Sequence, residues 1–500
     1  MKKILALICF VSCFVLVAQG QDAIDLNPIP MPQKMSIDWS NCVLFERLAL
    51  DCRDVKAESW VLSRVKEWYG EFAPKVSVAI TERMGLLEGD EAYHLVADKE
   101  GVTIKARTLV GVRNAMYTLR QLVIPKRGTL KTEGFIVPTC SIVDATKIKF
   151  RGIHLCWLPE MRAETIEREI RLAALFKFNV VVLEPWGVFK SEKHPWRNWP
   201  EANVTKADVR RLVQLGRELG VTLVPQLATF GHAAMARSIS SKHCVLDLHP
   251  EYAPLYEPGG WNWCLTNPET QRILREAIDE LLDAFDKPPY IHLGCDEAQP
   301  PTCPNCRKQG YGKLVGEHIA ALAEYVASRG ARAMIWHDML LEKGDKRWEG
   351  YYANGDRATI QMLETLPRDI IICDWEYENG EDVCNLRWPT MRYLKEKGFD
   401  VVGCPWENMR AAQTMGAALS EMGGLGLLQT TWHHMNGKNW TLMYRSGAAA
   451  AWGTPPPNDT PQCDSEFDRA LRFVGHDMKV KHYRDTGLSE EQIIPNKGLW

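Results

Sequence analysis

The fold is decided by residues 150–183, in which FRGIHL (150–155) is followed by AETIEREIRLAALF (163–176) and then by VVVL (180–183). The two short apolar runs are typical of buried strands, whereas the segment between them carries apolar residues at helical spacing. A strand, a helix and a strand in this order predict a βαβ unit with two parallel strands.

The same alternation of apolar runs and amphipathic segments continues to about residue 430. Eight strands separated by helices predict a (β/α)8 TIM barrel. An open doubly wound sheet is the alternative, but no Gly-rich phosphate loop follows the first strand. The expected strands are Phe150–Leu155, Val180–Leu183, Thr222–Val224, Tyr290–Leu293, Ala331–Ile335, Ile370–Cys373, Val401–Cys404 and Leu425–Gln429.

The chain divides into four parts: a signal peptide at 1–20, a small α/β domain at 21–147, the catalytic barrel at 148–455 and a polar, partly helical C-terminal tail at 456–500. In the small domain, short strands are expected at Ala92–Val96 and Val102–Ala106, and a helix at Val110–Leu122. The overall fold class is therefore α/β, a TIM barrel preceded by a small α/β domain.

The first twenty residues have the composition of a cleavable export signal. A positively charged start precedes the apolar run Ile4–Val17, and Ala18–Gly20 supplies a small-x-small cleavage site. A secreted or periplasmic protein follows from this interpretation. A lipid anchor at Cys13 is disfavoured because that residue lies inside the apolar run, and no later segment resembles a membrane span.

Composition narrows the class of ligand. The formal net charge is −3, which gives no electrostatic reason to expect nucleic acid as a partner. The 18 Trp suit the binding of sugars, since their flat faces match the apolar faces of sugar rings, although packing in the core is the alternative for most of them.

The residues that follow the strands are expected to form the active site, because a barrel carries it at the carboxyl ends of its strands. The acid pair Asp296-Glu297 comes directly after an apolar strand and a glycine. Adjacent carboxylates repel each other, which favours a protonated carboxyl that can act as a general acid in glycoside hydrolysis. A solvated pair that caps the next helix is the alternative.

At this point the sequence resembles a known family. HLGCDE (292–297) is similar to the His-x-Gly-Gly-Asp-Glu signature of the family 20 glycoside hydrolases, the β-N-acetylhexosaminidases. Cys295 replaces the second Gly, as in the hexosaminidase D-like branch. Similar motifs occur in the family's order, so that the resemblance extends over residues 27–450; they are Arg151-Gly152, Lys177–Asn179, Val224–Gln226, Gly231-His232 and, in the small domain, 92–95 and 111–122.

The resemblance implies an exo-acting retaining hydrolase that removes a terminal non-reducing β-linked N-acetylhexosamine, either GlcNAc or GalNAc. The substrate's own acetamido group would attack the anomeric carbon, so no carboxylate nucleophile is needed. Glu297 would be the general acid and base, and Asp296 would hold the acetamide N–H. Arg151 would bind ring hydroxyls of the terminal sugar, His232 would support the acid or the sugar, and hydroxyl binding is expected for Asp338 and Glu407. The acetamide methyl would be surrounded by Trp336, Trp375 and Trp432, and Tyr377 would bind the acetamide oxygen.

Two departures leave the sugar and its linkage open. Cys156 stands where many family members carry Asp, and Glu184–Trp186 does not preserve the acidic pattern of the second strand. A glycosidase for a modified hexosamine, or a catalytically weak barrel that binds amino sugars, therefore remains an alternative, although both acids of the pair are retained.

No cofactor and no metal are expected. Cys303 and Cys306 have a spacing that suits zinc only with two further ligands, and the sequence has no second pair of this kind. A local disulfide or two free thiols are favoured for them. A zinc-dependent hydrolase that uses His292, Asp296 and this pair is the third functional hypothesis.

Overall fold

A computed structural model describes residues 27–45, 50–52, 54–70, 75–81, 89–127, 132–146, 148–158, 161–200, 204–234, 245–377, 388–432, 437–454 and 461–478. The predicted signal peptide, with Cys13, lies outside these ranges. The chain forms two compact units. One contains Pro32–Ala145, and the other begins at Thr146 and includes Ile29–Met31.

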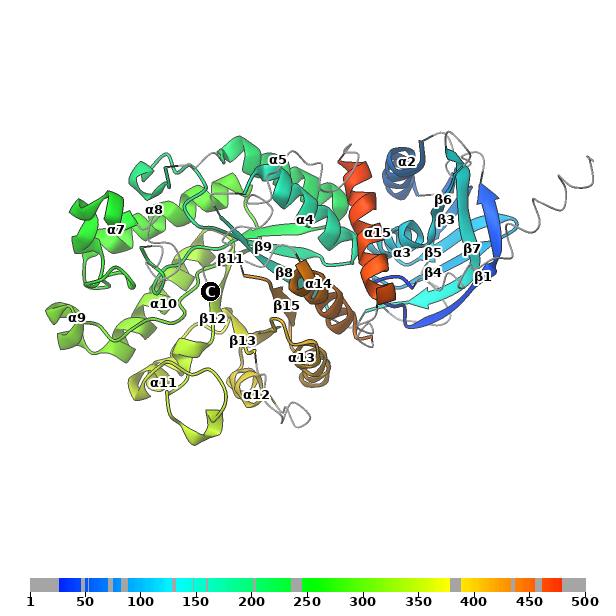
Figure 1. The fold of residues 1–500 in the computed structure, drawn as a ribbon. Coiled ribbons are helices and arrows are strands. Elements are labelled where there is room, and N and C mark those ends of the chain that lie inside the picture. Colours follow the sequence, from blue (N-terminus) through cyan, green and yellow to red (C-terminus); the bar gives the residue numbers. More distant parts are fainter. Residues whose placement is uncertain are drawn as a thin grey trace, which may run out of the picture. The chain divides into compact units, whose positions relative to one another are not determined.

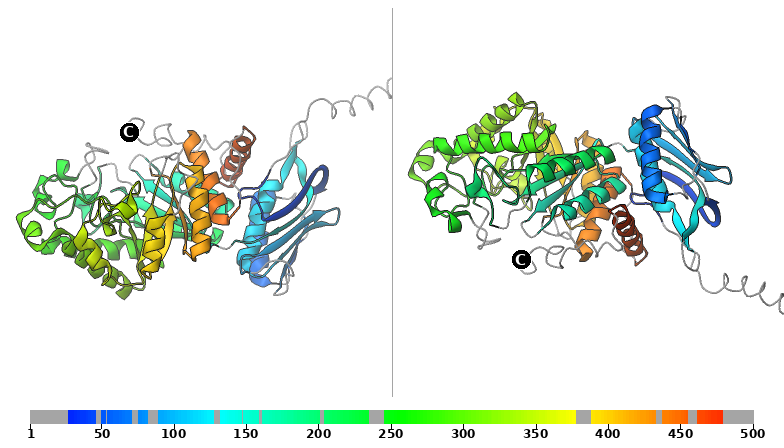
Figure 2. Two further views of the ribbon diagram at one scale, coloured as in Figure 1. Left: turned by 90° about the horizontal axis from the view of Figure 1, so that it is seen from below. Right: turned by 90° about the horizontal axis from the view of Figure 1, so that it is seen from above.

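The first unit is a mixed sheet with two helices on one face (Figures 1 and 2). The expected pair of strands forms an antiparallel hairpin and the expected helix is present as α3. Its strands have the order β1-β7-β4-β5-β3-β2, with β6 beside β7. The elements are β1 (Lys34–Phe45), β2 (Leu50–Cys52), α2 (Val55–Tyr69), β3 (Val76–Ile80), β4 (Tyr93–Asp98), β5 (Gly101–Ala106), α3 (Leu109–Leu122), β6 (Ile124–Arg127) and β7 (Thr132–Asp144).

The second unit contains the eight predicted strands, all parallel, in the order β10-β9-β8-β15-β14-β13-β12-β11. A single parallel bridge between Gln226 and His292 joins the two ends of this order and closes the sheet into a barrel. The strands are β8 (Phe150–Trp157), β9 (Val180–Pro185), β10 (Thr222–Pro225), β11 (Tyr290–His292), β12 (Arg332–Trp336), β13 (Ile371–Trp375), β14 (Asp400–Cys404) and β15 (Gly426–Thr430).

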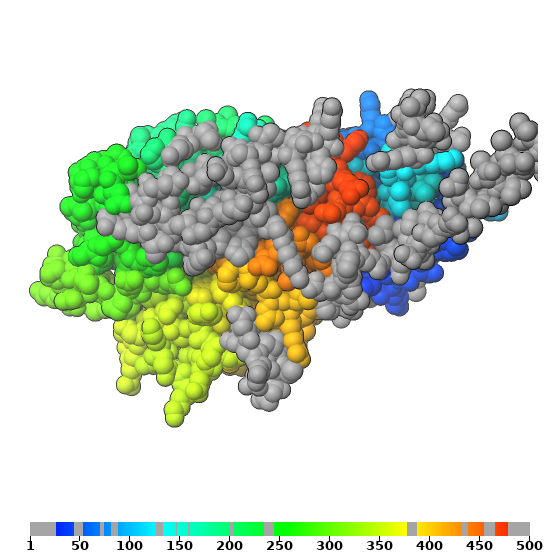
Figure 3. Space-filling model, viewed as in Figure 1, coloured from blue at the N-terminus to red at the C-terminus, as the bar shows by residue number. Residues whose placement is uncertain are grey.

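Helices surround the strands of the second unit (Figure 1). In the space-filling view, successive segments of the chain occupy successive sectors of this unit, from green through yellow to orange (Figure 3). The helices are α4 (Ala163–Leu175), α5 (Lys206–Leu219), α7 (Val245–Leu248), α8 (Pro268–Ala284), α9 (Pro304–Gln309), α10 (Tyr311–Ser328), α11 (Arg357–Leu363), α12 (Pro389–Glu396), α13 (Met409–Met422), α14 (Gly437–Trp452) and α15 (Pro461–Asp477).

The interior of the barrel is a packed core. Buried side chains from its strands meet at the centre, including Val182, Val224, Met334 and Leu428. Burial of branched apolar side chains here stabilises the barrel by about 25 cal/mol per Å² of apolar surface removed from water. A ligand site is therefore expected at the rim, where the strands end.

Part of the predicted C-terminal tail belongs to this unit. Helix α15 lies against α4, and Phe467 packs with its ring centroid 5.6 Å from Phe176 and 5.2 Å from Trp440. The described part of the tail is therefore less polar in its contacts than its composition suggests. In the described residues, no helix combines the length and apolar character that crossing a membrane requires.

The close approach of β15 to β8 requires a glycine at position 426. A Cβ added there would lie 1.9 Å from the carbonyl oxygen of Phe150 on the neighbouring strand β8. We expect Gly426→Ala to lower the free energy of unfolding by about 3 kcal/mol, because backbone cannot move aside as a side chain can. In the control Gly424→Ala, the nearest atom is the tip of Leu419, so a smaller loss is expected. Equal losses for both variants in urea unfolding would contradict this view of the strand contact.

Candidate active site

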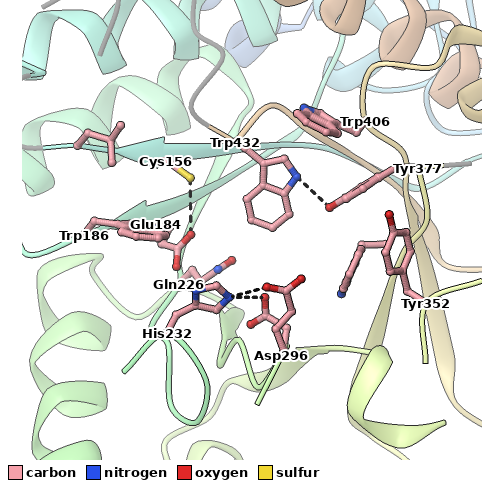
Figure 4. A pocket seen from close by; sticks show the side chains of 13 residues that line it. Cys156, Glu184, Trp186, Gln226, His232, Asp296, Tyr352, Tyr377, Trp406 and Trp432 are labelled. Atoms are coloured by element: carbon pink, nitrogen blue, oxygen red, sulfur yellow. Dashed lines mark hydrogen bonds and ion pairs between the residues drawn. The ribbon is translucent and has the colours of Figure 1, made fainter. Parts of the chain in front are cut away.

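A pocket of about 220 Å³ opens at the carboxyl ends of the barrel strands. Figure 4 shows a polar side, where His232 faces Asp296, and an aromatic side. Six of the eight strands supply lining residues from their ends or from the few residues that follow. The other two, β11 and β12, supply lining residues from the longer loops that follow them. The lining residues are Cys156, Leu158, Glu184, Trp186, Gln226, His232, Asp296, Glu297, Tyr352, Trp375, Tyr377, Trp406 and Trp432.

His232 lies between the two acids of the predicted pair. Its Nε2 is 3.5 Å from Asp296 Oδ2 and 3.3 Å from Glu297 Oε2. Burial alone would lower the pKa of His232, but the charges of Asp296 and Glu297 and their hydrogen bonds raise it to about 10. A positively charged imidazolium therefore lies between the two acidic side chains of the pair.

The two acids differ in their access to solvent. The side chain of Asp296 is 10% exposed, whereas that of Glu297 is 45% exposed. Asp296 lies deep in the pocket and Glu297 stands at its mouth. The pair can therefore act at two different depths on a bound ligand.

A tight turn presents these acids to the pocket. Gly294, Cys295 and Glu297 all have positive φ, at 65°, 72° and 46°. Left-handed backbone is costly for residues with a Cβ and persists only when surrounding contacts enforce it. One such contact is the N–H of Glu297, which donates to Asp338 Oδ2 at 2.9 Å. Another is Gly231, where an added Cβ would lie 2.0 Å from the carbonyl oxygen of Asp296.

The opposite wall of the pocket is aromatic. The rings of Trp375 and Tyr377 have their centroids 5.2 Å apart, and Trp406 lies 5.2 Å from Tyr377. The indole N–H of Trp432 donates to the Tyr377 hydroxyl oxygen at 2.8 Å. Because that oxygen already accepts a hydrogen bond, the Tyr377 O–H is available to donate to a ligand.

A second acidic group borders the pocket at β9. Glu184 Oε2 lies 3.7 Å from Cys156 Sγ and 3.7 Å from His154 Nε2. Burial raises the pKa of Glu184 to about 7, and the charge of Asp296 adds to this effect. Near neutral pH this carboxyl can thus donate or accept a hydrogen bond.

The structure brings six of the ten predicted site residues to the pocket. They are Asp296, Glu297, His232, Trp375, Tyr377 and Trp432. The remaining four, namely Arg151, Trp336, Asp338 and Glu407, do not line it. Their positions explain what they do instead.

Arg151 is placed at the opposite end of the barrel, so the expectation that it binds ring hydroxyls is corrected. As the second residue of β8 it lies at the amino end of the strand, five residues before Cys156. Its guanidinium donates to the carbonyl oxygens of Ile148 at 2.7 Å and Lys177 at 3.0 Å and lies over the ring of Trp452. Arg151 therefore holds the base of the barrel together.

Asp338 and Trp336 lie behind the pocket wall, where they position residues that do line it. Besides the Glu297 N–H, Asp338 accepts the indole N–H of Trp375 at 3.2 Å. Burial raises the pKa of Asp338 to about 7, and the charge of Asp296 contributes. Trp336 is 1% exposed, and its ring centroid lies 5.6 Å from that of Trp432. Glu407, the fourth residue, accepts from Asn439 Nδ2 at 2.8 Å.

Seven of the thirteen lining residues are not among the predicted site residues, and Tyr352 is the one among them that no strand end indicates. It lies on the long loop after β12, which has no periodic pattern, and its N–H donates to the buried Glu376 at 2.9 Å. Its ring centroid lies 4.3 Å from that of Trp375 and extends the aromatic wall. The other lining residues lie in the last positions of strands or after them, and this position relative to a strand is the signal that could have placed them.

Two models of one enzyme family match the chain. The catalytic domain of glycosyl hydrolase family 20 matches residues 183–409, and domain 2 of the same family matches residues 26–145. The chain belongs to glycosyl hydrolase family 20. The small first unit is thus the family's domain 2, and the pocket lies in its catalytic domain.

Curated relatives in this family are distant. A beta-hexosaminidase of Vibrio furnissii is 24% identical over 69% of this chain and 57% of its own length. A chitooligosaccharidolytic beta-N-acetylglucosaminidase of Bombyx mori is 26% identical over 42% of this chain and 38% of its own length. The chain therefore spans well under two thirds of the length of these relatives.

Solved structures of family 20 proteins share the fold. A beta-N-acetylhexosaminidase from Bacteroides fragilis aligns with a TM-score of 0.63 at 17% identity, over 93% of this chain and 99% of that one. A chitobiase from Flavobacterium johnsoniae aligns with a TM-score of 0.64 at 19% identity, over 95% of this chain and 75% of that one.

Arg151 should prove to be a structural residue. Arg151→Met would leave the carbonyl oxygens of Ile148 and Lys177 without this donor, which is expected to lower the free energy of unfolding by about 2 kcal/mol. Arg275→Met, at an exposed position of α8, is the control and should have little effect. If Arg151→Met were as stable as the wild type but no longer bound a ligand, Arg151 would have the substrate-binding role that the sequence predicted.

The position of His232 predicts how stability depends on pH. Its pKa in the folded protein is about 10, above the value of about 6.5 in an unfolded chain. The stabilisation from its charge is thus fully present below about pH 6.5 and is lost as pH rises toward 10. We expect the difference in unfolding free energy between the wild type and His232→Gln to shrink over this range. A difference that stays constant from pH 6 to pH 10 would mean that His232 is neutral in the folded protein.

Proposed function

We propose that this chain is an exo-acting retaining β-N-acetylhexosaminidase, which removes a terminal non-reducing β-linked GlcNAc or GalNAc. The observation that carries the proposal is that Asp296 and Glu297 line one pocket together with a wall of aromatic side chains. Membership of family 20 supports the same reaction. The substrate is then a glycan with a terminal N-acetylhexosamine, and nucleic acid is not a partner.

The difference in exposure supports different roles for the two acids. Glu297 is 45% exposed and stands where the leaving group would extend into solvent, which suits a general acid that protonates the glycosidic oxygen. His232 then stabilises the carboxylate that remains. In the second half of the reaction, the same carboxylate takes a proton from water as that water attacks the anomeric carbon.

Asp296 is the better placed acid for the acetamide. Its side chain is 10% exposed and can accept the acetamide N–H, which orients the acetamide oxygen for attack on the anomeric carbon. The Tyr377 O–H, whose oxygen accepts from Trp432, would donate to that acetamide oxygen. Trp375, Trp406 and Trp432 would surround the methyl group.

We further infer that the chain belongs to the hexosaminidase D-like branch and is exported. Cys295 supports the first point, since it occupies a left-handed position, φ 72°, that a glycine would adopt freely. The thiol is buried and lies 3.2 Å from Thr229 Oγ1. The N-terminal sequence supports secretion or transfer to the periplasm, and sequencing of the mature N-terminus tests it.

One observation favours a modified hexosamine as the alternative substrate. Cys156 and Glu184 meet inside the pocket, and a carboxyl with a pKa of about 7 is suited to recognise a polar substituent or an altered hydroxyl. A barrel that only binds amino sugars remains the other alternative, and measurable turnover excludes it.

The acid pair generates a direct test. Glu297→Gln should lower kcat on an aryl β-N-acetylglucosaminide by about 10³-fold, the contribution of a general acid. Asp296→Asn should lower it by about 10²- to 10³-fold, as expected when a preorganised electrostatic contact is lost. Glu407→Gln, a matched change at the same rim outside the pocket, should retain activity. Near-normal rates for Glu297→Gln would contradict the proposed function.

A panel of aryl glycosides separates the alternatives. Hydrolysis of GlcNAc or GalNAc glycosides without hydrolysis of glucosides is expected from acetamide participation. Faster hydrolysis of a 6-sulfated glycoside than of the plain GlcNAc glycoside would favour the modified sugar. Equal rates on glucosides would contradict the substrate-assisted mechanism.

A further inference from the structure

Three cysteines gather in the barrel unit next to the loop of the acid pair. Cys264 lies on the loop between β10 and α8, and Cys303 and Cys306 lie at the start of α9. The Cys264 Sγ is 3.9 Å from the Cys303 Sγ and 3.8 Å from the Cys306 Sγ. Cys264 and Cys306 are buried, and Cys303 is half-buried.

These separations fit a shared metal ion and not a disulfide. Sulfurs bound to one tetrahedral zinc at about 2.3 Å lie about 3.8 Å apart, whereas the two sulfurs of a disulfide lie about 2.0 Å apart. All three thiols are free in the structure, and any one disulfide would leave the third without a partner. The sequence pattern showed only Cys303 and Cys306, which are close together in the chain, and the structure adds Cys264 as a third thiol beside them.

A buried carboxylate completes the set of donors. One oxygen of Glu257 and the three sulfurs all lie within 4.8 Å of one another. The Glu257 Oε2 accepts the N–H of Thr302 at 2.8 Å and that of Cys303 at 2.7 Å, which orients the carboxylate toward the thiols. Hydrogen bonds of this kind typically hold the ligands of a metal in place.

We propose that Cys264, Cys303, Cys306 and Glu257 bind a structural zinc ion. Four protein donors, three of them sulfur, suit a closed tetrahedral zinc site with no open position for a substrate. The Thr266 hydroxyl lies 3.2 Å from the Cys306 Sγ and can donate to the thiolate. None of these residues lines the pocket, so the ion has no part in the hydrolysis itself.

The site would join the two loops that carry His232 and the acid pair. Glu257 and Cys264 come from the loop after β10, and the other two ligands follow Glu297 on the loop after β11. The same loops are already linked at Trp261, whose Nε1 donates to the Glu297 carbonyl oxygen at 2.7 Å, and at Asn262, whose Nδ2 donates to Gln299 at 2.6 Å. The zinc ion would fix the far end of the segment 297–303 and thereby limit the movement of the general acid.

Metal analysis of the full-length protein, purified without chelator, tests the proposal without any activity measurement. We expect close to one zinc per chain, and loss of that zinc in Cys264→Ser and in Cys306→Ser. Cys42→Ser, at an exposed cysteine of β1 outside the cluster, should keep its zinc. Removal of the zinc by a chelator should lower the melting temperature of the wild type but should not alter that of Cys264→Ser.

Cobalt substitution of the wild type keeps the test valid if a variant fails to fold. Tetrahedral Co²⁺ bound by three thiolates is expected to give an intense sulfur-to-metal charge-transfer band and strong visible bands. A wild-type protein with no stoichiometric zinc and no such spectrum overturns the proposal. So does an intact mass, under non-reducing conditions, that shows a disulfide within the cluster.

Discussion

The left-handed turn from Gly294 to Glu297 is the constraint on which the site depends. Residues from neighbouring loops make contacts that hold the turn in this conformation. Gly231 leaves room for the carbonyl of Asp296, and Asp338 accepts the N–H of Glu297. Trp261 from the preceding loop donates to the carbonyl of Glu297. Without these contacts, positive φ at two residues with side chains would relax, and the two acids would leave the positions in which His232 can bridge them.

Electrostatics at the rim follow from burial as much as from charge. Glu184 and Asp338 are both buried, and the pKa of each rises to about 7. The pKa of His232 is raised as well, to about 10, because this side chain is in contact with the two acids of the pair, and His232 therefore stays protonated. The pocket therefore gathers several acidic side chains without a large net negative charge, which suits a neutral, hydroxylated ligand such as a sugar.

The sequence was sufficient for the architecture because the barrel repeats one simple pattern. All eight strands were predicted at nearly the observed positions, since buried parallel strands have continuous apolar runs. The acid pair could also be found, because it directly follows such a run. Arg151 was misplaced for a physical reason. A motif at a strand's first residues lies a full strand length away from the rim, whereas the pocket is lined by the last residues of the strands and by residues after them.

Other features depend on contacts that no local pattern reports. Tyr352 reaches the pocket from a long loop without periodicity. Trp336 and Trp375 both end strands, yet one is covered by its neighbours and the other lines the pocket. Cys264 joins Cys303 across 39 positions of sequence, so the cluster of thiols appears only once the two loops are folded.

The way the barrel closes has a consequence for how the protein loses activity on heating. Between β10 and β11 the seam is closed by the bridge between Gln226 and His292 and by hydrogen bonds from the N–H and the hydroxyl of Thr229 to the carbonyl oxygen of Leu293, and His292 is only four residues from Asp296. Local opening of this seam would displace the acid pair at a lower temperature than the one at which the whole domain unfolds. Inactivation by heat would then precede global unfolding, and adaptation of the enzyme to a new growth temperature would be concentrated in the few side chains that brace the seam.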